Sequence, residues 1–482
     1  MKRKFITNLI LLIFLNVLVK PFWIFGIDIP VQNAVGAASY GFYGSLLNFS
    51  MILNIILDLG LTNFNNRNIA QHGHMLRKYL SNIVGLKFLL AVFYAVVCLV
   101  MAWVVGYDRL QFHLLFFLIA NQFMISFTLY LRSNISGLHL FRTDSLLSVL
   151  DRFLMIIICG LLLYTNIAGG EFHIEWFVYA QTAAYGMATL VTFAVVLAKS
   201  GRIHIRFDYR FFLVLLRQSY PYALLILLMS FYNRIDSVMI ERLLPDPLGK
   251  EQAGIYANAF RLLEAVTMFG FLFSGLLLPI FARMLQQKDD ITQLLKLSYT
   301  LIIVPAIVIG ISSNFYNHEI MSLLYRRNVE FSSPIFGLLM ISFIFISTTY
   351  IFGTLLTANG SLKQLNIMAF AGMVINVGLN FLLIPKIEAL GSAWSSLVTQ
   401  CFTAFSQVLI AVSIFKLKIN YRLLAKLGLF IVFTIIAGRL SLFFANWIIG
   451  FIVACTAGLV FAFITRLINL KTLFGIVFSN ES

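Results

Sequence analysis

The chain has 482 residues, of which 60% are hydrophobic and only 11% are charged, and its formal net charge is +16. Soluble domains carry about 25% charged residues, so this much apolar surface cannot be buried in one water-soluble core. The composition therefore predicts a membrane protein. The basic residues lie in short segments between apolar runs, which argues against nucleic-acid binding, and we expect no nucleic-acid partner.

Long apolar segments follow one another along most of the chain. A spanning helix needs about 20 apolar residues, and fourteen segments meet this condition. The sequence therefore predicts an all-α integral membrane protein of the multi-pass class. In chain order the predicted spans are 5–27, 39–60, 80–104, 113–132, 147–166, 176–198, 219–241, 254–282, 297–315, 333–357, 366–384, 391–415, 427–445 and 448–467.

The basic residues are divided unequally between the two sides of these spans. If Met1 is cytoplasmic, 24 of the 35 Lys and Arg residues face the cytoplasm, six face outward and five lie within spans. Segments rich in Lys and Arg stay on the side of synthesis. The pattern predicts that both termini lie in the cytoplasm.

A weak internal repeat predicts the domain organisation. Gly41-Phe42-Tyr43 opens the second span and Gly254-Ile255-Tyr256 opens the eighth, an offset of 213 residues. Repeats with an even number of spans keep the same orientation and form parallel lobes. We expect an N-lobe at 1–198, a basic cytoplasmic linker at 199–218, a C-lobe at 219–415 and two additional spans in 416–482.

Three cations lie deep within predicted spans: Lys20, Arg234 and Arg261. Each is seven residues from the outer end of its span, about 10 Å below the boundary at a rise of 1.5 Å per residue. Ionisable residues inside a membrane are costly and are functional candidates by default. We predict that these three residues bind an anionic part of the substrate.

Structural alternatives remain open for these cations. Lys20 can extend its side chain to the outer interface, and Arg261 can pair with Glu264 three residues along the same helix face. Arg234 is two residues from Asp236, a spacing that places them on different helix faces. Lys87 and Arg439 lie nearer the ends of their spans, where extension to the interface is the expected behaviour.

The acidic residues are fewer. Asp58 and Asp236 are candidates for gating or for coupling to an H⁺ or Na⁺ gradient, because buried carboxylates serve as ion sites. Asp144 and Asp151 lie among arginines at the inner start of the fifth span and predict boundary ion pairs. The pair His72 and His74 lacks a third ligand, and no catalytic motif or cofactor site appears. The four cysteines lie in apolar runs without a pairing pattern.

Several short motifs resemble those of Wzx-type oligosaccharide flippases of bacterial surface-polysaccharide pathways. They are Gly26-Ile27-Asp28, Val31-Gln32-Asn33, Tyr40-Gly41, Leu47-Asn48-Phe49-Ser50, Leu57-Asp58-Leu59-Gly60, Asn63-Phe64-Asn65-Asn66-Arg67, Arg132-Ser133-Asn134, Asn233-Arg234-Ile235-Asp236, Gly254-Ile255-Tyr256, Arg261-Leu262, Asn376-Val377-Gly378-Leu379-Asn380 and Gly391-Ser392-Ala393. The resemblance implies the two-lobed fold of the multidrug extruders and the lipid II flippase. It also implies a polyprenyl-pyrophosphate-linked oligosaccharide as substrate, with Lys20 as the cation of the first span.

The resemblance predicts a multi-pass transporter of the bacterial inner membrane, not an enzyme, that serves O-antigen, capsule or exopolysaccharide synthesis. We expect a monomer that contacts membrane lipid and works beside a polysaccharide polymerase and chain-length machinery. Two alternatives remain. A drug or cation antiporter of the same fold would have acidic residues in its cavity, and a membrane glycosyltransferase or polymerase would need a larger outer loop than this chain has.

Overall fold

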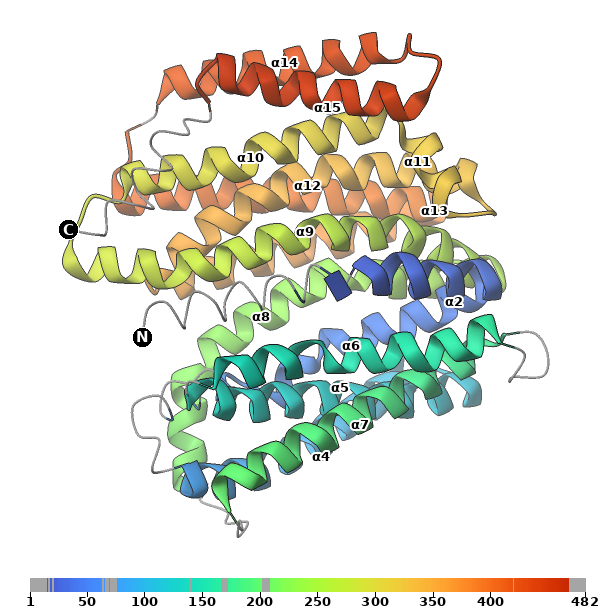
Figure 1. Cartoon of the computed structure of the whole chain (residues 1–482), viewed down its shortest axis with the longest axis vertical. Helices are drawn as coiled ribbons and strands as arrows, with labels where there is room; N and C mark the ends of the chain where they lie inside the picture. Colours follow the sequence, from blue (N-terminus) through green and yellow to red (C-terminus); the bar gives the residue numbers. More distant parts are fainter. Residues whose placement is uncertain are drawn as a thin grey trace. The chain divides into compact units, whose positions relative to one another are not determined.

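The structure is a computed structural model that describes residues 15, 18–19, 21–62, 65, 69, 76–138, 140–165, 172–201, 209–418 and 420–467. Its described part consists of helices and the short connections between them (Figure 1). Helices suit a membrane because they satisfy their backbone hydrogen bonds internally. The elements are a π-helix Ile24–Asp28, α2 Ile29–Ile52, a 3-10 helix Asn54–Leu57, α4 Leu76–Val105, α5 Arg109–Gly137, α6 Phe141–Tyr164, α7 Ile174–Ser200, α8 Tyr209–Leu243, α9 Leu248–Gln287, α10 Thr292–Phe315, α11 Asn317–Leu324, α12 Val329–Ala358, α13 Leu362–Phe415, α14 Tyr421–Ser441 and α15 Trp447–Ile464.

Eleven helices in the described part are long and apolar enough to cross a membrane. They agree with the third to fourteenth predicted spans, because α13 holds two of these spans on either side of a kink at Ile387 and Glu388. The predicted first span lies largely outside the described residues. The chain is thus an all-helical multi-pass membrane protein.

The second span differs from its predicted range of 39–60. Its helix α2 begins at Ile29 and is broken at Gly36, which has a φ of +81° that a residue with a Cβ rarely adopts. The helix ends at Ile52, and the chain then forms the 3-10 helix Asn54–Leu57, which directly precedes Asp58. Hydropathy could not reveal this early end, because the residues beyond it are still apolar.

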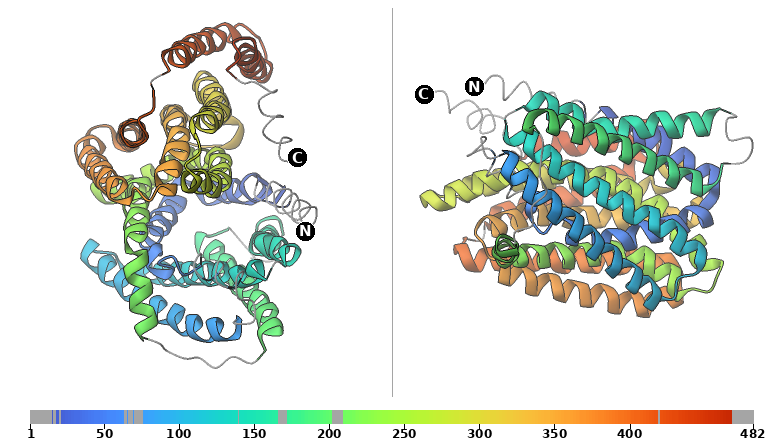
Figure 2. Two further views of the ribbon diagram at one scale, coloured as in Figure 1. Left: turned by 90° about the vertical axis from the view of Figure 1, so that its left-hand side faces the viewer. Right: turned by 90° about the horizontal axis from the view of Figure 1, so that it is seen from below.

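The chain forms two compact units, residues 1–254 and 255–482. In the first unit α4, α5, α6 and α7 run side by side (Figure 2), and α2 packs along α8. The buried residues Leu80, Ile83 and Leu131 belong to the apolar core between these helices. The lobe boundaries predicted from the repeat stay predictions.

In the second unit α12 packs against α13 and α10, and the hairpin of α14 and α15 packs on α10 (Figure 1). Glycines allow this close approach. A Cβ on Gly438 of α14 would overlap the Phe315 ring, and one on Gly458 of α15 would lie 2.9 Å from Val308. Small residues at helix crossings are typical of membrane bundles, where helices associate by packing.

Candidate functional site

The predicted substrate residue Arg234 lies on α8 in the first unit and is partly buried. Its Nη1 donates to Oδ1 of Asn48 on α2 at 2.9 Å. The Asn48 amide in turn donates to the Ser237 hydroxyl at 3.2 Å, and the Ser45 hydroxyl donates to the Ser237 carbonyl at 3.0 Å. The guanidinium is therefore held in part by a polar contact between α8 and α2.

The other predicted substrate residues have different surroundings. Lys20 lies outside the described residues. Arg261 lies on α9 in the second unit, where its Nη1 donates to the Glu264 carboxylate at 2.7 Å. Both side chains of this pair are partly exposed. The same-face pair considered from the sequence thus forms, and the use of Arg261 by a substrate stays a prediction.

The predicted coupling residues Asp58 and Asp236 both belong to the first unit. Asp236 is buried on α8. Asp58 follows the 3-10 turn after α2 and accepts from Lys87 of α4 at 2.6 Å. The Lys87 Nζ also donates to the Leu57 carbonyl at 2.9 Å and to the Ser126 hydroxyl at 3.1 Å.

This finding corrects the expectation for Lys87. The side chain is only 1% exposed, so it does not extend to the interface. It instead binds the Leu57 carbonyl, at the segment that follows the early end of α2. Arg439, in contrast, is exposed in the last turn of α14, as expected for a side chain that reaches the interface.

Sequence reasoning missed a polar cluster at the start of α5. Gln111 donates to the Glu241 carboxylate at 2.6 Å and accepts from Arg242 at 2.8 Å. The Arg242 guanidinium also lies over the Tyr107 ring, 4.3 Å from its centre. Glu241 stands at the predicted end of the seventh span, where nothing in the sequence indicated that its side chain is buried.

A second missed residue is Asp28, at the end of the π-helix. It is 1% exposed and accepts from the Tyr40 hydroxyl at 3.0 Å and from the Gln32 amide at 3.4 Å. The available signal in the sequence was a carboxylate beside a long apolar run. In the structure Asp28 ends a π-helical turn, a feature that is frequent at functional sites. Asp28 and Asp236 are the most deeply buried carboxylates among the described residues of the first unit.

The short motifs noted in the sequence meet one another in space. Besides Asn48 with Arg234, the Asn65 amide donates to the Ser133 hydroxyl at 2.8 Å and to Asn134 Oδ1 at 3.0 Å. A Cβ on Gly41 would overlap the backbone of Gly254, its counterpart in the internal repeat. These motifs therefore specify contacts between helices.

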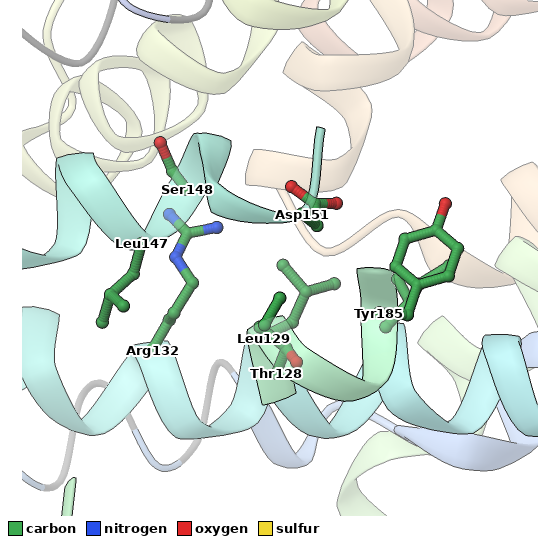
Figure 3. Close-up of a pocket in the computed structure, with 9 residues that line it drawn as sticks. Thr128, Leu129, Arg132, Leu147, Ser148, Asp151 and Tyr185 are labelled. Atoms are coloured by element: carbon green, nitrogen blue, oxygen red, sulfur yellow. The ribbon is translucent and has the colours of Figure 1, made fainter. Parts of the chain in front are cut away.

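A pocket in the first unit lies among α5, α6 and α7 (Figure 3). Arg132 extends from α5 toward Ser148 on α6, with Asp151 and Tyr185 beyond it. Its Nε donates to Asp144 at 2.8 Å, so the boundary pair expected for Asp144 is formed with Arg132. The pocket volume of about 50 Å³ is too small for an oligosaccharide. We therefore regard the pocket as a structural feature beside the ion pair of Arg132 and Asp144.

The described residues contain no group of three or more His, Cys, Asp or Glu side chains that could hold a metal ion. The predicted histidine pair, His72 and His74, lies outside them.

Comparison with known proteins identifies the family. Residues 5–285 match the family model described as "Polysaccharide biosynthesis protein". The chain belongs to this family. A comparison with curated protein sequences found no match.

Solved structures show the fold of this polysaccharide biosynthesis protein. The lipid II flippase MurJ in an inward closed conformation matches with a TM-score of 0.72 and 14% identity, over 94% of this chain and 98% of that one. An inward-facing multidrug resistance MATE family transporter of the MOP superfamily matches with a TM-score of 0.58 and 14% identity, over 81% and 95%. The Vibrio cholerae MATE transporter VcmN in its bent form matches with a TM-score of 0.53 and 15% identity, over 86% of this chain and 97% of that one.

These comparisons confirm the predicted family resemblance and fold class. The fold is the one seen in the lipid II flippase MurJ and in MATE family transporters. The protein is a multi-pass member of the polysaccharide biosynthesis protein family with this fold.

Proposed function

We propose that the protein moves a polyprenyl-pyrophosphate-linked oligosaccharide from the cytoplasmic to the periplasmic leaflet of a bacterial inner membrane. The family match supports a role in surface-polysaccharide synthesis, and the fold is shared with a lipid II flippase. Transport proceeds by alternating access and serves the assembly of O-antigen, capsule or exopolysaccharide. Lys20, Arg234 and Arg261 supply cations for the pyrophosphate.

One observation carries the proposal for the binding site. Arg234 is a partly buried guanidinium within a membrane span, oriented by Asn48 of another helix. A planar guanidinium can bind two phosphate oxygens at once. The polyprenyl tail would stay in lipid while the sugar crosses between the leaflets.

The test is rescue of surface polysaccharide in a flippase-null strain, with membrane abundance measured alongside. Hydrogen bonds to charged groups contribute about 1.5–3 kcal/mol, so Arg234→Ala should lower transport roughly tenfold to a hundredfold. Arg234→Lys should restore part of the loss, because it keeps the charge but not the planar fork. Lys250→Ala, which removes a partly buried cation paired with Asp246, is the matched control. Full rescue by Arg234→Ala would contradict the assignment.

The orientation has its own test. Reporter fusions after Ser200 and Ser482 should both report the cytoplasm, as the charge distribution predicts. An outward signal at Ser200 would contradict the orientation proposed for the first six spans.

A drug or cation antiporter is the second candidate, and the buried Asp28 and Asp236 favour it. Competition in proteoliposomes separates the two functions. A flippase should be inhibited by lipid-linked oligosaccharide, whereas an antiporter should be inhibited by organic cations and should move protons or sodium ions in exchange.

A further inference from the structure

A cavity in the second unit is lined by cations from three elements. Lys296 comes from α10, Arg422 and Lys426 come from α14, and Arg466 follows the end of α15. The cavity has a volume of about 280 Å³, and Asn420, Leu423 and Leu467 complete its lining. We call these four cations and their cavity the basic basin.

The described residues that line the basic basin include no carboxylate, so they do not balance its charges. Among the described residues, none of the four cations takes part in an ion pair. Lys426 donates to the Thr465 carbonyl at 2.7 Å, a bond that ties α14 to α15 without neutralising the charge.

The positions of these cations oppose simple helix electrostatics. Arg422 and Lys426 are four residues apart on α14, where like charges repel. Arg422 also lies in the first turn of α14, near the positive end of the helix dipole. An anion in the basin would offset both effects.

The location indicates where such an anion comes from. α10 and α14 begin at the basin and α15 ends there, so it lies where three candidate spans leave the hydrocarbon layer. Next to it, Tyr421 is 75% exposed and Ile464 is 72% exposed. Tyrosine is typical of the membrane interface, and the exposed apolar side chain offers a surface for an acyl chain.

We infer that the basic basin binds the phosphate of an anionic membrane phospholipid and so anchors α14 and α15 to the leaflet predicted to be cytoplasmic. Water occupies about 30 Å³ per molecule, so the cavity has room for a phosphodiester. Basic pockets between helices on the cytoplasmic side are suited to lipid headgroups. This inference does not depend on the proposed function.

The test compares two variants that lose the same number of charges. The basin variant is Lys296→Gln/Arg422→Gln/Arg466→Gln, which leaves the Lys426 contact intact. The control is Lys363→Gln/Lys416→Gln/Lys418→Gln, whose exposed lysines also lie in segments predicted to be cytoplasmic. Retention of phosphatidylglycerol is measured by native mass spectrometry after reconstitution in mixed phosphatidylglycerol and phosphatidylcholine nanodiscs.

We expect the wild type and the control to bind phosphatidylglycerol with similar affinity. The basin variant should bind it at least tenfold more weakly. Equal retention by both variants would overturn the inference. Thermal unfolding in detergent provides a second measurement, in which phosphatidylglycerol should raise the Tm of the wild type. If inorganic phosphate raised it equally, the basin would be a site for free anions and not for lipid. Arg422→Gln alone should lower retention severalfold, which keeps the test decisive if the triple variant fails to fold.

Discussion

The two units of the molecule treat charge differently in their interiors. Among the described residues, the buried charged side chains all belong to the first unit: Asp28, Lys87, Asp144, Asp236 and Glu241. The buried polar residues of the second unit are uncharged, such as Asn376, Asn380 and Ser392. The cations of the second unit lie at its margin, as in the basic basin, or pair within one helix, as in Arg261 with Glu264.

This contrast indicates where the interior of the protein depends on electrostatics. Charges are expensive inside a membrane unless they are paired or face a polar cavity. In the first unit, contacts to charged side chains join separate elements. Lys87 forms an ion pair with Asp58, and Gln111 donates a hydrogen bond to Glu241. The second unit instead relies on neutral hydrogen bonds, whose loss costs less. Removal of a buried polar contact should therefore lower the free energy of unfolding more in the first unit than in the second.

The largest expected effect is at Lys87. Removal of one partner from a buried ion pair costs about 3–5 kcal/mol, and Lys87→Met should lie near 3 kcal/mol because Asp58 is partly exposed. Chemical unfolding of the purified protein measures the loss of free energy of unfolding. The double variant Lys87→Met/Asp58→Asn should recover much of it, since no charge is then left without its partner. An unchanged stability of Lys87→Met would show that the pair contributes nothing.

A smaller loss is expected at Gln111. Its side chain bonds to Glu241 and to Arg242, and bonds to charged groups contribute about 1.5–3 kcal/mol. Gln111→Leu should therefore lower the free energy of unfolding by about 2 kcal/mol. Gln122→Leu on the same helix is the control, because the Gln122 amide nitrogen is buried without a hydrogen-bond partner in the described part of the chain. Equal losses from the two variants would contradict the role of the Gln111 cluster.

The corresponding change in the second unit should cost less. The Ser392 hydroxyl donates to Asn380 Oδ1 at 2.8 Å, and the Asn380 amide donates to Asn376 at 3.1 Å. Neutral hydrogen bonds contribute about 0.5–1.5 kcal/mol, so Ser392→Ala should cost about 1 kcal/mol. A double-mutant cycle with Asn380→Ala isolates the bond. A loss as large as that of Lys87→Met would remove the contrast between the units.

Hydropathy and loop charge were sufficient to predict most spans, because both follow directly from the cost of placing residues in lipid. They failed at α2. The break at Gly36 depends on a backbone angle, and the early end of the helix accompanies the pairing of Asp58 with Lys87. Neither signal appears in an average of hydropathy over a window.

The site was predictable only in part, for a related reason. Depth along a span identified Arg234 and Arg261 as intramembrane cations, but it could not identify their partners. Those partners come from a different helix for Arg234 and from the same helix for Arg261. Lys87 was misread because its distance from the end of the span does not reveal the carboxylate that holds it. Glu241 was missed because a helix end can be buried by neighbouring helices.

The smallest expected stability change is at Arg261 and Glu264, and it also tests their function. An i,i+3 ion pair contributes about 0.2–0.5 kcal/mol, and both side chains are partly exposed. Glu264→Gln should therefore change the free energy of unfolding by no more than about 0.5 kcal/mol. The exchange Arg261→Glu/Glu264→Arg rebuilds the pair but moves the cation three residues along α9, about 4.5 Å at a rise of 1.5 Å per residue. If Arg261 binds the pyrophosphate, the exchanged variant should remain as stable as the wild type and yet rescue surface polysaccharide poorly at equal membrane abundance. Normal rescue by the exchanged variant would mean that Arg261 serves the ion pair alone.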